Sequence, residues 1–64
     1  MQSGLEIQAL WFEDGGGIQR KDGRRIVTHN EYHGDYDLDW ALVMDGDKEI
    51  SRYNLIFVAV IEWV

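Results

Sequence analysis

Three carboxylates at every second residue are the first feature of this chain that could do chemistry. Asp35, Asp37 and Asp39 are spaced like the oxygen ligands at the start of a calcium-binding loop. The rest of that loop is missing, because Trp40 stands where glycine is needed and Gly46 where a bidentate glutamate is needed. We therefore expect a solvated acidic surface here and no metal site.

The two histidines and a serine are the other candidates for catalysis or metal binding. His29 and His33 are four residues apart, which suits zinc only on a helix, and Gly34 favours a loop. Ser51 could join a histidine and an aspartate in a triad, but nothing in the sequence positions these side chains. We therefore expect no cofactor, no metal and no enzymatic activity.

A cluster of positive charge is the more informative feature. Arg20, Lys21, Arg24 and Arg25 are four of the six cations in the chain. Arginine forks bind phosphates and carboxylates alike, so the cluster could dock onto nucleic acid or onto an acidic protein surface. It could also be a charged edge that prevents strand-to-strand aggregation. The sequence leaves both interpretations open.

The overall charge limits the choice of partner. The formal net charge is −6, which disfavours nucleic-acid binding because that requires a basic field. The regular carboxylates could mimic a phosphate backbone or serve solubility alone. Tyrosines near them could form an interface hot spot. The candidate partner-binding residues are Arg20, Lys21, Arg24, Arg25, Tyr32, Asp35, Tyr36, Asp37, Asp39 and Tyr53.

The length of 64 residues predicts one domain spanning residues 1–64. There is no cysteine, so the core must come from apolar packing. The sequence has no basic segment followed by an apolar run, so it does not predict a secretory signal. The apolar run 55–61 is too short to cross a bilayer as a helix. We expect a soluble, cytoplasmic protein without a membrane partner.

The elements that must position these residues are predicted to be strands. Residues 4–12 alternate apolar and polar side chains and predict a strand that ends at the glycines of 13–17. Residues 18–21 and 24–28 flank Asp22-Gly23, a typical type I′ hairpin turn. This hairpin would place the four cations around its tip.

The second half predicts a loop followed by a meander. Residues 29–37 have no clear period, and 38–44 predict a strand whose even positions face the core. A turn at 45–47 leads to a short strand at 48–50. Residues 51–54 predict a 3₁₀ turn or a loop.

The last strand is predicted at residues 55–64. β-Branched residues favour a strand over a helix, and both faces are apolar apart from Glu62. A closed barrel would cover one face of this strand. A partner or a second copy of the chain could cover the other, so homo-oligomer formation through 55–64 is left open.

This order of elements resembles an SH3-like barrel of the Tudor or KOW type over residues 38–60. The resemblance is carried by the segments 40–44, 45–46, 48–50, 51–54 and 55–57. It implies an all-β fold, a small five- or six-stranded SH3-like barrel with one short 3₁₀ turn. The short, acidic chain is also similar in style to many phage-encoded proteins, which would place it in the host cell cytoplasm.

The functional hypothesis is a small acidic protein-interaction module that binds a larger protein and modulates or inhibits it. A phage-encoded regulator of a host protein and a nucleic-acid mimic are specific forms of this hypothesis. One alternative is a nucleic-acid-binding barrel that uses the cations of residues 20–25. Another is a self-associating structural subunit.

Overall fold

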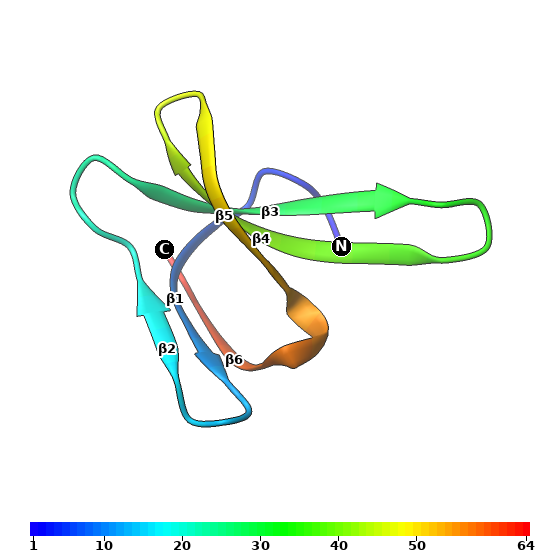
Figure 1. Cartoon of the computed structure of the whole chain (residues 1–64), viewed down its shortest axis with the longest axis horizontal. Coiled ribbons are helices and arrows are strands. Elements are labelled where there is room, and N and C mark those ends of the chain that lie inside the picture. The colour runs from blue at the N-terminus through cyan, green and yellow to red at the C-terminus, as the bar shows by residue number, and fades with distance from the viewer.

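A computed structural model describes all of residues 1–64 and shows an all-β protein (Figure 1). The elements in chain order are β1 (Glu6–Phe12), β2 (Gly17–Gln19), β3 (Arg25–Tyr32), β4 (Asp37–Asp45), β5 (Lys48–Asn54), the 3₁₀ turn η1 (Leu55–Phe57) and β6 (Val58–Trp63). The predicted all-β class with five or six strands and one short 3₁₀ turn is confirmed, and the number of strands is six. The chain contains no helix of the length and apolarity needed to cross a membrane.

The six strands form one strongly curled sheet around β1. β6 pairs with one edge of β1, while β2 and β3 both pair with its other edge. β4 and β5 follow β3 as antiparallel neighbours. No pairing joins β5 to β2 or to β6, so the sheet is a half-barrel that stays open on one side (Figure 1).

The predicted hairpin between residues 18–21 and 24–28 is wrong, because both segments pair with β1. Ile18 lies opposite Leu10, and Ile26 lies opposite Ile7. Each pairing brings an isoleucine to the core, which a hairpin between the two segments would not require. β2 and β3 therefore pair with β1 as two parts of one strand, and residues 21–24 loop out between them.

The turn inside this loop is also different from the predicted type I′. Gly23 has φ of 79°, but no residue other than glycine has positive φ, so Asp22 does not. The Arg24 N–H donates to the Lys21 carbonyl oxygen at 3.0 Å. Positive φ only at the third position, with this hydrogen bond, is typical of a type II turn.

The predicted loop at residues 29–37 is wrong over most of its length. β3 and β4 pair without interruption from Arg25↔Met44 to Tyr32↔Asp37, so only 33–36 form a turn. Gly34 supplies a φ of 79° in that turn. The polar side chains of this hairpin are spread over both sides of the strands, which hides the strand period in the sequence.

The 3₁₀ turn lies later than predicted. Residues 51–54 continue β5, and the turn starts after Asn54, whose side-chain oxygen accepts from the Ile56 N–H at 3.0 Å. This cap fixes the start of the turn because it satisfies an N–H without a backbone partner. The predicted strand at 55–64 is consequently shortened to β6.

The core is small and lies on the inner, concave face of the sheet. Ile7, Leu10, Ile26 and Ala41 are at most 1% exposed and pack together. The buried Ala41 shows that odd positions of β4 face the core, so the predicted even-position core is wrong. Even positions lie on the opposite side of the sheet, called here the outer face.

Candidate functional site

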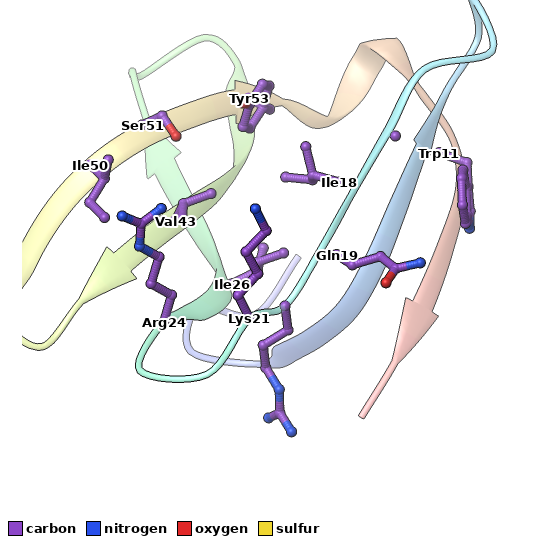
Figure 2. Close-up of a pocket in the computed structure, with 12 residues that line it drawn as sticks. Trp11, Ile18, Gln19, Lys21, Arg24, Ile26, Val43, Ile50, Ser51 and Tyr53 are labelled. Carbon is purple, nitrogen blue, oxygen red and sulfur yellow. The ribbon is translucent and has the colours of Figure 1, made fainter.

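The inner face is hollowed into a groove between β2 and β5 (Figure 2). Its volume is about 470 Å³, within the range of roughly 300–1,000 Å³ that ligand sites occupy. Apolar side chains from three strands line it, namely Ile18, Ile26 and Val43, with Tyr53 beside them. The groove exists because the half-barrel does not close between β2 and β5.

The loop of residues 21–24 stands at one end of this groove. The Arg20 N–H still donates to the Gln8 carbonyl oxygen at 2.8 Å, and β3 begins at Arg25. The four residues between them leave the sheet, and the side chains of Lys21 and Arg24 point toward the groove (Figure 2). The loop therefore places two cations at the mouth of an apolar groove.

The four predicted cations fall into two pairs. Arg20 and Arg25 both approach Glu6, with Nη1 to carboxylate distances of 3.3 Å and 3.9 Å. Lys21 and Arg24 form no ion pair with any carboxylate of the chain. Of these four cations, only Lys21 and Arg24 are left without an ion pair and so available to a carboxylate of a ligand.

A second depression of about 500 Å³ shares Tyr53 with the groove. The rings of Phe12 and Tyr53, which both line this depression, lie 5.3 Å apart. Glu13 and Asp14, in the turn before β2, also line it. Acidic side chains therefore precede β2, and the free cations Lys21 and Arg24 follow it.

The predicted acidic and aromatic residues do not join this site. Tyr32 and Tyr36, which are 72% and 57% exposed, lie at the tip of the β3–β4 hairpin together with Asp35 and Asp37. This tip and the loop of residues 21–24 are at opposite ends of the longest axis of the molecule (Figure 1). Of the predicted partner-binding residues, only Tyr53 accompanies the cations.

Asp39 is held by the fold. The Asn30 side-chain amide donates to Asp39 at 3.0 Å, and the N-terminal ammonium lies 3.2 Å away. The Asn30 hydrogen bond, helped by the ammonium charge, lowers the pKa of Asp39. This carboxylate therefore fastens the N-terminus to the β3–β4 hairpin.

Sequence analysis missed a charged network on the outer face. The Arg52 guanidinium lies 2.7 Å from Glu49 and 2.9 Å from Glu31, and 5.2 Å from the ring of Trp40. The Arg52 hydrogen bonds are the main cause of the lowered pKa of Glu31 and of Glu49, and they raise the pKa of Arg52. The network links three strands.

Both histidines lie at the edge of this network. The Nε2 atoms of His29 and His33 are 3.4 Å and 3.2 Å from the Glu31 carboxylate. Residues 29, 31 and 33 share one side of the chain because side chains alternate along a strand. This alternation was the signal in the sequence that could have placed His29, Glu31 and His33 together. It was missed because residues 29–37 were predicted to form a loop.

The structure does not bring together the residues considered above for a catalytic triad or a metal site. Ser51 faces the groove, whereas His29 and Glu31 lie on the outer face. No group of three or more histidine or carboxylate side chains could hold a metal ion. The groove itself presents apolar side chains, two cations without ion pairs and Tyr53.

Comparison with protein-family models, with curated proteins and with solved structures finds no match to this chain. The resemblance to SH3-like barrels and to phage-encoded proteins therefore stays a prediction. The functional argument depends on the geometry of the groove.

Proposed function

We propose that this protein is a non-enzymatic interaction module whose groove binds part of a larger protein and thereby modulates or inhibits it. The groove offers apolar surface, two cations and the Tyr53 ring on a rigid sheet. Interfaces of this kind combine a buried apolar centre with a polar rim. The module would act by occupying a surface of its partner.

The observation that supports this proposal is the state of Lys21 and Arg24. The chain has twelve carboxylates for six Lys and Arg side chains, so acidic partners are abundant. These two cations nevertheless face the groove without an ion pair. A partner that carries carboxylates and apolar side chains complements both properties of the groove.

The distribution of charge around the groove also separates this proposal from the nucleic-acid alternative. Nucleic-acid sites follow the phosphate backbone with cations along their whole length. Here Glu13 and Asp14, in the turn before β2, line the depression next to the groove. A protein segment can match both the cations and these carboxylates, whereas a phosphate backbone would be repelled by the carboxylates.

The test is capture of partners from a lysate of the source or its host, with and without nuclease, by the wild type and three variants. Lys21→Glu and Arg24→Glu reverse the groove cations. Lys48→Glu is the matched control, because Lys48 also lacks an ion pair but lies outside the groove. Lys21→Glu and Lys48→Glu change the net charge equally.

The proposal expects a nuclease-resistant protein that Lys21→Glu and Arg24→Glu lose and Lys48→Glu retains. We expect the affinity for that protein to fall about tenfold or more for each groove variant. Equal capture by all three variants would contradict the proposal. Loss of the captured material on nuclease treatment would instead favour the nucleic-acid alternative.

Self-association is a second candidate, favoured by the surface around β6. Ile56, Phe57, Val60 and Trp63 are between 48% and 72% exposed. Sedimentation at increasing concentration tests it, with Val60→Asp as the variant that would disrupt a dimer. A monomer at the highest concentration would rule this candidate out.

A further inference from the structure

We propose that the groove takes up an extended, acidic and apolar peptide segment, which pairs as an additional β-strand with the free edge of β2. This inference rests on the proposed function and specifies what part of the partner is bound. It is argued from the backbone of β2, from the side chains of the groove and from the two free cations.

The backbone of β2 offers unused hydrogen-bonding groups. The Phe12 N–H donates to the Gly16 carbonyl oxygen at 2.7 Å, and the Arg20 N–H to the Gln8 oxygen at 2.8 Å. In an antiparallel pair every second residue is bonded to the partner strand, so the groups of Gly17 and Gln19 point away from β1. Neither residue has a hydrogen bond from outside the sheet pairing.

This edge also lacks the usual protection against pairing. Exposed edges are commonly blunted by charged side chains, proline or bulges. The three residues of β2 are Gly17, Ile18 and Gln19, of which the first and last are exposed and none is charged. The edge of β5 differs, since it carries Lys48, Glu49 and Arg52. An added strand therefore fits β2 better than β5.

The side chains of the groove define the chemistry of the segment. Side chains alternate along a strand, so every second residue of the added segment would face Ile18, Ile26 and Val43. β-Branched apolar residues fit such a surface. Carboxylates at one end of the segment would reach Lys21 and Arg24, where an arginine fork binds a carboxylate with two hydrogen bonds.

The opposite charges at the two ends of β2 orient the segment. Glu13 and Asp14, in the turn before β2, repel a carboxylate, while Lys21 and Arg24, in the loop after it, attract one. A segment with acidic residues at one end and an apolar centre is therefore bound in one direction. The same segment with lysines in place of its acidic residues would be rejected.

The test uses blocked synthetic peptides and the full-length chain labelled with ¹⁵N. The first peptide has valine at every second position, threonine between them and aspartates at one end. The second carries lysines instead of the aspartates. The third and fourth peptides have the sequence of the first with N-methyl groups on alternate amides, one peptide for each of the two possible registers. N-methylation removes the N–H donors that strand pairing needs.

The proposal expects the first peptide to shift the Gly17 and Gln19 amide signals and to slow their hydrogen exchange at least tenfold. The lysine peptide and one of the two N-methylated peptides should bind at least tenfold more weakly. Gln19→Pro should weaken binding of the first peptide in the same way, because it removes an outward N–H without removing a hydrogen bond to β1. Circular dichroism checks that this variant folds.

Three results would overturn the strand-addition inference. Undiminished binding of both N-methylated peptides would mean that side chains alone hold the segment. No change at Gly17 and Gln19 would place any binding elsewhere. Shifts of these two signals with protein concentration alone would mean that a second copy occupies the edge. None of these results affects capture that depends on Lys21 and Arg24, so the proposed function is tested separately.

Discussion

The outer face and the groove of this sheet use arginine in opposite ways. Arg52 on the outer face binds both Glu31 and Glu49 and lies against Trp40. Arg24 at the groove has no ion pair, although the chain has twice as many carboxylates as Lys and Arg side chains. The comparison separates a charge that holds the fold together from one that is available to a partner.

The difference arises from strand pairing. β3, β4 and β5 bring Glu31, Glu49 and Arg52 to the same side of the sheet, where they neutralise one another. Residues 21–24 lie outside the strands, so Lys21 and Arg24 have no cross-strand neighbour. Measuring both the stability and the partner binding of variants on the two faces tests whether these two roles are separate.

The largest effect is expected where the groove and the core share a residue. Ile26 is 1% exposed and also lines the groove, so Ile26→Ala should cost about 2–5 kcal/mol of unfolding free energy and largely unfold so small a domain. Ile50→Ala is the control, because Ile50 lines the groove but is 42% exposed. Urea unfolding measures the free-energy cost of each substitution. Equal costs would contradict the distinction between the buried Ile26 and the exposed Ile50.

A smaller effect is expected at Gly17. A Cβ there would lie 2.5 Å from Trp11 Cε3 and 2.8 Å from the Leu10 carbonyl oxygen, so β2 must shift from β1. Gly17→Ala should cost roughly 1–3 kcal/mol, as overpacking does. In the matched variant Gly16→Ala the Cβ meets only side-chain atoms, Asp14 Oδ1 at 3.2 Å and Phe12 Cδ2 at 3.8 Å, so this variant should cost less. A reversed order in thermal unfolding would contradict this account.

A third prediction concerns pH and the outer-face network. The pKa values of Glu31 and Glu49 are lowered by Arg52 in the folded protein. Carboxyls with a lowered folded pKa stabilise above their unfolded pKa, and this stabilisation is lost as pH falls below about 5. Arg52→Met should therefore lower the urea midpoint at pH 7 and flatten its decline toward about pH 3. Parallel curves for wild type and variant would show that the ion pairs of Arg52 with Glu31 and Glu49 contribute no pH-dependent stability.

The smallest effect on stability is expected at Arg24. Arg24→Met removes a side chain without an ion pair and should change the unfolding free energy by about 0.5 kcal/mol or less. Binding of the partner should nevertheless weaken about tenfold. A stability loss as large as that of Arg52→Met would mean that Arg24 serves the fold after all.

Local patterns allowed much of the fold to be predicted. The apolar alternation of β1 and β4 and the Asp-Gly turn between β4 and β5 identified these elements, and the all-β class followed. The second half of β3 was missed because His29, Glu31 and their neighbours show no apolar period. The 3₁₀ turn was placed too early because the capping role of Asn54 was not recognised.

The site could be predicted only in part, for a different reason. The cations of residues 20–25 are close in sequence, so the sequence alone predicts that they lie close together in space. Their division into a bound and a free pair depends on Glu6, which a long-range strand pairing brings near Arg20 and Arg25. The groove itself results from an unclosed sheet, and no local pattern encodes that.

The loop of residues 21–24 has a consequence for how this fold could diversify. It interrupts a strand whose two parts, β2 and β3, are each held by β1. Its length and sequence can therefore change without shifting the register of either part, and loop length itself costs little free energy. New ligand preferences could evolve or be engineered there while the sheet stays the same, as with a replaceable recognition segment on a constant scaffold.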